Sequence, residues 1–131
     1  MNKADRSSYI EYRIESVHKA LASARLLAEN SMWEACTNRL YYAVFYAVNA
    51  LLVKNEIKAS THSGLKTQFS LRFVKTGLLP KNFGVLLSRV FDLRNEGDYG
   101  NLFTIEEEEI VNLFPEVEQM IDRIIIEIRK S

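Results

Sequence analysis

The stretch SMWEACTNRLYYAVFYAVNALLVK, residues 31–54, largely decides the fold, because it combines two different faces on one predicted helix. Apolar side chains recur in it at spacings of three and four, the period of one side of an α-helix. A second stripe at the same spacing is polar and aromatic. The apolar face comprises Trp33, Cys36, Leu40, Val44, Val48 and Leu51, and the polar-aromatic face comprises Asn38, Arg39, Tyr42, Tyr46 and Asn49.

The polar-aromatic face has two interpretations. Its tyrosines can fill core space while their hydroxyls reach the edge of the core. Alternatively, the face lines a cleft or a contact between subunits. The pattern of residues 31–54 does not choose between them.

The same helical period continues on both sides of this stretch. It predicts one helix over about residues 5–30, a shorter one from Ser60 or Thr61 to Gly77, a fourth opening at Pro80, and a long final one after residue 104. Ser31 and Glu34 form a capping-box pattern that predicts the start of the second helix. We therefore expect an all-α protein: an up-and-down helical bundle of four long helices plus one shorter helix, with residues 1–131 as a single domain.

Composition narrows the classes of function. The chain has 131 residues, and its 17 basic and 17 acidic residues give a formal net charge of zero. The protein therefore has no overall positive electrostatic field that would attract nucleic acid. Any contact with RNA would be local, and no DNA binding is expected. A single cysteine, Cys36, excludes an intramolecular disulfide and a multi-cysteine metal site. No apolar leader and no run of 18 apolar residues occur, so we expect a cytoplasmic protein without a membrane partner.

A second decisive stretch lies where the fourth helix should end. It places an arginine, an amide, two carboxylates and a phenol within six residues, in the segment Leu93-Arg94-Asn95-Glu96-Gly97-Asp98-Tyr99-Gly100. Arg94 follows Val90 by four residues, which places its Cα on or beside the buried side of that helix. A guanidinium in that position needs partners, because an unpaired buried charge is strongly unfavourable. Asp98, four residues later, is the nearest candidate if the helix extends that far.

His62 is predicted in the first turn of the third helix. The helix dipole disfavours the charged form of a histidine at that end, so a neutral imidazole that accepts a proton is plausible. Capping or packing is the alternative role. No histidine pair, phosphate loop or nucleophile elbow occurs, so we expect no metal and no cofactor.

Three motifs in this order resemble the HEPN domain, in particular the small prokaryotic HEPN proteins that pair with minimal nucleotidyltransferases. RLYYAVFYA, residues 39–47, resembles the tyrosine-rich second helix of that family. THSGL, residues 61–65, resembles its Thr-His-x-Gly-Leu segment, and residues 94–99 resemble its Arg-x4-Tyr variant. The resemblance extends from about Tyr9 to Ile128.

The resemblance implies a helical bundle that usually forms a homodimer and brings two late-helix motifs into one composite cleft. Catalytic members are metal-independent ribonucleases with an arginine, usually a polar residue, and then a histidine four to six positions after the arginine. Arg94 and Asn95 match the first two elements, whereas Tyr99 stands where the histidine is expected. A phenol with a pKa near 10 is a poor general base at neutral pH. His62 could in principle supply the imidazole from another helix.

Several functions follow as hypotheses. The leading one is a homodimer acting with a nucleotidyltransferase, whose cleft binds a nucleotide or phosphate group through Arg39, Tyr42, His62, Arg94, Asp98 and Tyr99. The alternative is a ribonuclease toxin, in which His62 takes the proton of a 2′-hydroxyl while Arg94, beside Asn95, stabilises the phosphate. The family also implies that the partner could attach AMP to Tyr99. Finally, the cluster could be a purely structural network.

Overall fold

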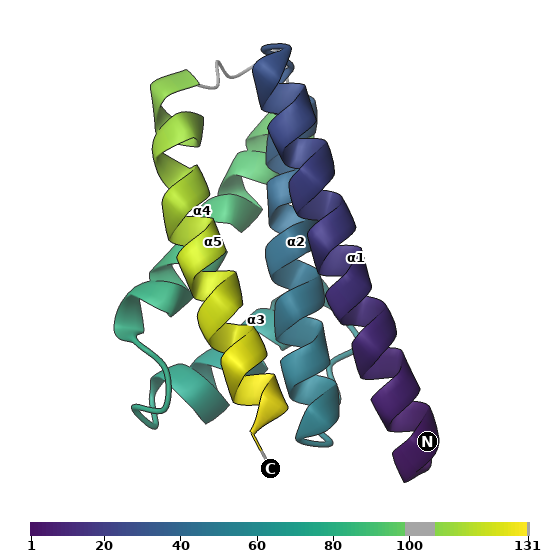
Figure 1. Ribbon diagram of the computed structural model, residues 1–131. Helices are drawn as coiled ribbons and strands as arrows, with labels where there is room; N and C mark the ends of the chain where they lie inside the picture. The colour runs from purple at the N-terminus through teal and green to yellow at the C-terminus, as the bar shows by residue number, and fades with distance from the viewer. Residues whose placement is uncertain (99–106, 131) are drawn as a thin grey trace.

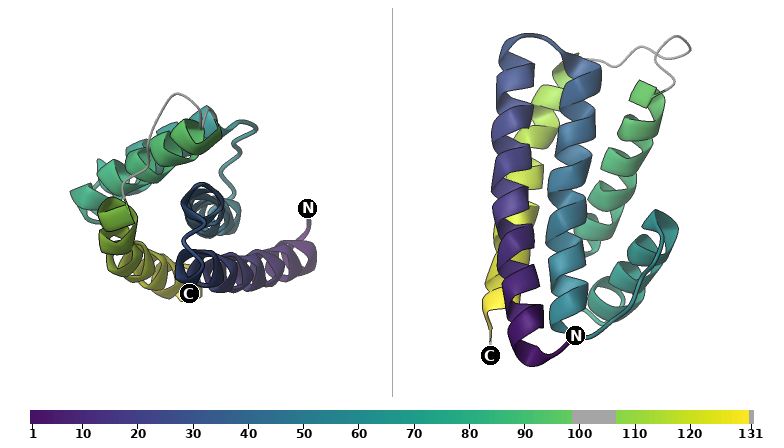
Figure 2. Two further views of the ribbon diagram at one scale, coloured as in Figure 1. Left: turned by 90° about the horizontal axis from the view of Figure 1, so that it is seen from above. Right: turned by 90° about the vertical axis from the view of Figure 1, so that its right-hand side faces the viewer.

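Helix α2, Trp33–Lys54, occupies the middle of the computed structural model, which describes residues 1–98 and 107–130. Seen from above, the other helices surround it on three sides (Figure 2). α2 packs on α1 (Lys3–Glu29), α4 (Lys81–Asp98) and α5 (Glu107–Arg129), and on the short α3 (His62–Phe69). α1 and α2 form an antiparallel pair, whereas α4 and α5 run in opposite directions with little contact between them (Figure 1). Within the described residues every regular element is helical, which confirms the predicted bundle of four long helices and a shorter one.

The apolar face of α2 is the centre of the core. Cys36, Leu40, Val44, Val48 and Leu51 are each at most 1% exposed, as the spacing predicts. Fully burying an aliphatic side chain of this size contributes about 1.5–3 kcal/mol relative to leaving it exposed. Burial of the apolar face therefore fixes the position of α2 in the bundle. The polar-aromatic side chains are carried by the same fixed backbone.

The predicted capping box at Ser31 is wrong. α2 begins at Trp33, and its N-cap Met32 has no side-chain cap. Ser31 instead has a left-handed φ of 56°, and its N–H donates to Ala28 while the Met32 N–H donates to Leu27. These are the two bonds of a Schellman motif, which satisfies the last carbonyl groups of α1. Ser31 thus ends the first helix and does not start the second.

The third helix differs from the expected single run to Gly77. α3 ends at Phe69 and continues as a π-helical segment, Ser70–Val74, before Gly77 turns the chain with a φ of 81°. Leu65, Phe69 and Phe73 are all buried, at a strict spacing of four. That spacing drifts around a 3.6-residue helix, and the wider turn keeps Phe73 facing inward.

Candidate functional site

The polar-aromatic face of α2 is partly open. All of its members are half-buried: Asn38, Arg39, Tyr42, Tyr46 and Asn49. In the views of Figure 2, α1 and the α3–α4 layer lie on different sides of α2. Side chains from α3 and α4 meet this face at Tyr42, and side chains from α1 meet it at Tyr46 and Asn49.

Arg94 reaches from α4 onto two consecutive tyrosines of α2. Its guanidinium carbon lies 5.5 Å from the ring centroid of Tyr41 and 5.5 Å from that of Tyr42. A guanidinium this close to an aromatic ring gains about 0.5–2 kcal/mol, more when water is excluded. Arg94 itself is half-buried. The prediction that Arg94 lies on or beside the buried side of its helix is thereby confirmed, and the rings are among its partners.

Arg39 approaches the same Tyr42 ring from within α2. Its guanidinium carbon is 5.1 Å from the Tyr42 centroid, and its Nε and Nη2 donate to Oδ1 of Asn38 at 3.1 and 2.8 Å. Among the side chains that the structure describes, Arg39 has no carboxylate partner. Two guanidinium groups, one from α2 and one from α4, therefore converge on one ring.

His62 lies against the same aromatic group. Thr61 caps α3 as predicted, its Oγ1 accepting the Gly64 N–H at 2.8 Å, and this fixes the first turn that carries His62. The imidazole is 4.8 Å from the Phe45 ring and 5.6 Å from the Tyr41 ring, stacked on both. Burial and, to a smaller extent, the positive charge of Arg94 lower the pKa of His62. The imidazole is accordingly neutral at physiological pH.

Tyr41 is the residue that joins these groups, and the sequence analysis did not select it as a site residue. It is only 1% exposed, and its hydroxyl is hydrogen-bonded to Nδ1 of His62. Burial raises the pKa of Tyr41 to about 12. The available signal was its place between the two faces of α2: a tyrosine facing the core needs a hydrogen-bond partner for its hydroxyl.

A third cation, Arg13, lies further along the same face. The Arg13 guanidinium of α1 lies 4.9 Å from the Tyr46 ring, 5.1 Å from Tyr9 and 5.3 Å from Tyr12. The Tyr9 hydroxyl accepts from Arg13 Nε at 2.9 Å and donates to Asn49 Oδ1 at 2.8 Å. Since the Tyr42 and Tyr46 rings are 5.7 Å apart, Arg13 continues the row of cations and rings.

Five other arginines of the described residues pair with glutamate. Such pairs join Arg6 to Glu56, Arg25 to Glu118, Arg89 to Glu109, Arg123 to Glu127 and Arg129 to Glu11. Although the net charge of the chain is zero, arginine side chains are concentrated locally, where they lie over the tyrosine rings of the polar-aromatic face of α2.

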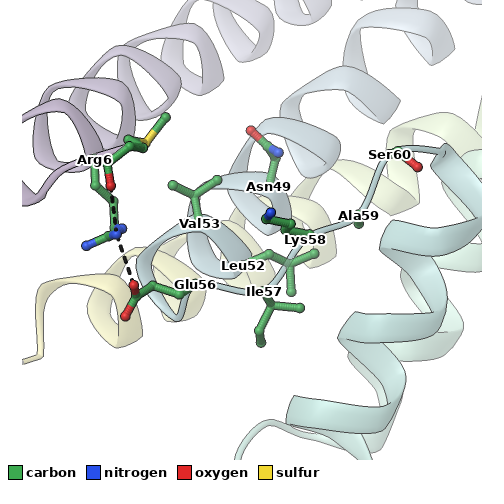
Figure 3. Close-up of a pocket in the computed structure, with 10 residues that line it drawn as sticks. Arg6, Asn49, Leu52, Val53, Glu56, Ile57, Lys58, Ala59 and Ser60 are labelled. Carbon is green, nitrogen blue, oxygen red and sulfur yellow. Dashed lines mark hydrogen bonds and ion pairs between the residues drawn. The ribbon is translucent and has the colours of Figure 1, made fainter.

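A surface pocket of about 540 Å³ lies beyond Asn49, where the end of α2 meets the start of α1 (Figure 3). Leu52, Val53 and Ile57 form its apolar part, and the ion pair between Arg6 and Glu56 closes one side at 3.0 Å. Asn49 is its only link to the polar-aromatic face within the described residues. The predicted site residues do not line this pocket.

Some predicted roles cannot be placed. Asn95 is half-buried beside Arg94 in α4. α4 continues to Asp98, but the Asp98 side chain and the whole of Tyr99 lie outside what the structure describes. Within residues 1–98 and 107–130, no group of three His, Cys, Asp or Glu side chains is arranged to hold a metal ion. Over the same residues, no helix is long and apolar enough to cross a membrane.

Comparison with known proteins agrees with this architecture. The family model described as the HEPN domain matches residues 10–128. A UPF0332 protein of Thermotoga maritima is 38% identical over 120 residues, covering 92% of this chain and 91% of the relative. A protein of Methanocaldococcus jannaschii named "Putative toxin MJ0605" is 32% identical over 115 residues, covering 88% of this chain and 85% of that protein. The chain described here therefore belongs to the HEPN domain family.

Proposed function

We propose that the cluster of Arg39, Tyr42, His62 and Arg94 binds the phosphate of a nucleotide or of a phosphate-bearing partner group. The observation that carries this proposal is the convergence of Arg39 and Arg94 on the ring of Tyr42, at 5.1 and 5.5 Å. Two positive charges near one ring attract a phosphate more strongly than either does alone. Guanidinium groups also offer the paired N–H donors that match phosphate oxygens.

His62 adds a third polar group without adding charge. Its imidazole is neutral, because burial and Arg94 hold its pKa below the ordinary value. The ring of Tyr42 lies next to the two arginines, and the ring of Tyr46 is 5.7 Å from it, so the two rings give a base a surface on which to stack. A phosphate joined to a base suits this combination of cations and rings better than a bare anion does.

We further propose that the protein acts in a toxin-type system, as a homodimer beside a minimal nucleotidyltransferase. This proposal is supported by membership of the HEPN family and by a relative that is named "Putative toxin MJ0605". The partly open face of α2 is where a second copy would complete a composite cleft. In such a system Tyr99 is the candidate acceptor of AMP from the partner. Mass spectrometry of the protein co-expressed with the neighbouring nucleotidyltransferase detects both the complex and an adduct.

Calorimetric titration with AMP, ATP and short RNAs tests the binding proposal. Arg94→Ala should fold normally and bind about ten- to a hundred-fold more weakly, since a hydrogen bond to a charged group contributes about 1.5–3 kcal/mol. The matched control is Arg25→Ala, which removes an exposed arginine paired with Glu118 at 3.1 Å on the α1–α5 side. The control should bind like the wild type. If none of these ligands binds the wild-type protein, the proposal fails.

A metal-independent ribonuclease is the second candidate, and one observation favours it. The structure brings His62 into the aromatic group that contacts Arg94, so an imidazole is present although Tyr99 replaces the motif histidine. Expression of the chain without its neighbour distinguishes the two functions. Growth arrest that both Arg94→Ala and His62→Ala relieve supports the ribonuclease. Harmless expression of a soluble protein supports the binding function.

A further inference from the structure

The hydrogen bond between Tyr41 and His62 determines what His62 can do. Tyr41 is 1% exposed, and the only partner of its hydroxyl among the described residues is Nδ1 of His62. A neutral phenol has one hydrogen to donate, and a neutral imidazole has one nitrogen that donates and one that accepts. Two arrangements are therefore possible, and they leave opposite chemistry on the other nitrogen, Nε2.

The burial of Tyr41 discriminates between the arrangements. If Nδ1–H donated to the phenol oxygen, the Tyr41 hydrogen would be left in the core without an acceptor. Burying a polar group without a partner is unfavourable by about 1–3 kcal/mol. If Tyr41 donates to Nδ1, that hydrogen is satisfied, and the hydrogen of the imidazole must be on Nε2. His62 is half-buried, and its Nε2 is not among the buried side-chain atoms without a partner in the described residues, so that nitrogen is accessible to a ligand.

We infer that Tyr41 is a positioning residue: it holds His62 as the Nε2–H tautomer, so that His62 offers the site an uncharged hydrogen-bond donor and not a general base. This inference rests on the proposed phosphate site and states what its ligand must present, namely an unprotonated acceptor oxygen such as that of a phosphoryl group. The lone pair that would take a proton from a 2′-hydroxyl is already occupied by Tyr41.

A proton relay through Tyr41 does not restore basic character. To free a lone pair on Nε2, the imidazole would have to release its Nε2 hydrogen while the phenol hydrogen moves to Nδ1, and this leaves a tyrosinate in the core. Burial raises the pKa of Tyr41 to about 12, so the phenol keeps its hydrogen at neutral pH. Among the described side chains, Arg94 and Tyr42 are the other charged or titratable groups that contact Tyr41, and Lys66 of α3 lies over the neighbouring Phe91 ring. No carboxylate is recorded in contact with the imidazole among the described side chains.

Nitrogen-15 NMR of the histidine side chains, recorded at a pH where both are neutral, tests the inference directly. The chain has two histidines, and the exposed His18 serves as an internal reference for a solvated imidazole. The expected wild-type spectrum shows His62 protonated at Nε2, with the Nδ1 resonance shifted as for a hydrogen-bonded acceptor. Tyr41→Phe should abolish that Nδ1 shift, whereas Tyr42→Phe should leave it in place. His18 should not change in either variant.

The inference is overturned by a His62 protonated at Nδ1, or by an Nδ1 resonance that Tyr41→Phe does not move. The wild-type tautomer decides the question even if Tyr41→Phe folds poorly. Adding AMP then separates this inference from the proposed function. A shift of the His62 Nε2–H signal supports both. If His62 is the Nε2–H tautomer but does not respond to AMP, the inference about the tautomer is supported and the proposed phosphate site is contradicted. If His62 is the Nδ1–H tautomer and AMP binds, the phosphate site is supported and the inference about the tautomer is contradicted.

Discussion

The hydroxyl of Tyr41 and Nδ1 of His62 form a hydrogen bond that ties the buried middle of α2 to the first residue of α3. Arg94 of α4 lies over the ring of the same tyrosine, at 5.5 Å. One buried phenol therefore connects three helices and holds two of the site residues predicted from sequence. This arrangement makes the site rigid, because Tyr41 is packed in the core and cannot shift without disturbing it.

Removal of the Tyr41 hydroxyl should destabilise the protein. Tyr41→Phe keeps the ring but leaves Nδ1 of His62 without its partner, so the free energy of unfolding should fall by about 1–3 kcal/mol. Tyr42→Phe is the matched control, because no hydrogen bond of the Tyr42 hydroxyl is recorded within the described residues. Urea unfolding of both variants measures the difference. Equal stabilities would mean that the Tyr41–His62 bond contributes nothing.

The N-cap of α3 should also matter for His62. Thr61→Ala removes the acceptor of the Gly64 N–H, which lies 2.8 Å from Thr61 Oγ1, and should lower stability by about 1 kcal/mol. Thr61→Ser retains a hydroxyl and should behave like the wild type. Urea unfolding gives the stabilities, and the His62 resonances show whether the ring has lost its fixed position. An Ala variant as stable as the Ser variant would argue against the cap.

The pH dependence of stability should contain a contribution from His62. Its pKa in the folded state is lowered from 6.5, chiefly by burial, so between the folded value and 6.5 the unfolded chain binds more protons. Stability should therefore rise with pH across that window and be fully regained above about pH 6.5. His62→Gln should flatten this part of the curve, whereas His18→Gln, at an exposed position, should not. Denaturant unfolding between pH 5 and pH 8 makes the comparison, and equal slopes in the wild type and His62→Gln would contradict it.

Two glycine substitutions should have opposite effects. Gly77 has a φ of 81°, a conformation that disfavours a side chain, so Gly77→Ala should destabilise the protein by about 1 kcal/mol. Gly84 lies inside α4, and a Cβ there would meet Val74 at an ordinary 3.7 Å. Gly84→Ala should therefore stabilise the protein by up to about 1 kcal/mol, the difference in helix propensity. Thermal unfolding of both variants provides the test; a shift in the same direction for both would refute the explanation.

Hydrophobic spacing predicted most of the fold. The period of three and four located each long helix and identified the buried members of α2, such as Leu40 and Val44. The capping-box pattern failed at Ser31, because a serine followed by a glutamate three residues later is equally compatible with the end of the preceding helix. Hydrophobic spacing failed after Phe69, because the hydrogen bonds of a wider turn leave no distinct signature in the order of side chains.

The candidate site was predicted only in part. Arg39, Tyr42, His62 and Arg94 were selected as separate motifs, and the structure brings them around the Tyr41–Tyr42 pair. Tyr41 escaped selection because its role depends on a partner 21 positions away, which spacing within one helix cannot indicate. The roles of Asp98 and Tyr99 remain predictions, since their side chains lie outside the described part of the chain.

The central claim is that a phosphate-bearing ligand binds at the cluster of Arg39, Tyr42, His62 and Arg94. Titration of the nitrogen-15-labelled protein with AMP, followed by the backbone and side-chain N–H signals, tests it most directly. We predict saturable shifts concentrated at residues 38–46, His62 and Arg94, which require about ten- to a hundred-fold more AMP in Arg94→Ala and are unchanged in Arg25→Ala. Shifts confined to the separate pocket around Leu52, Val53 and Ile57, or no shifts at all, would contradict the claim.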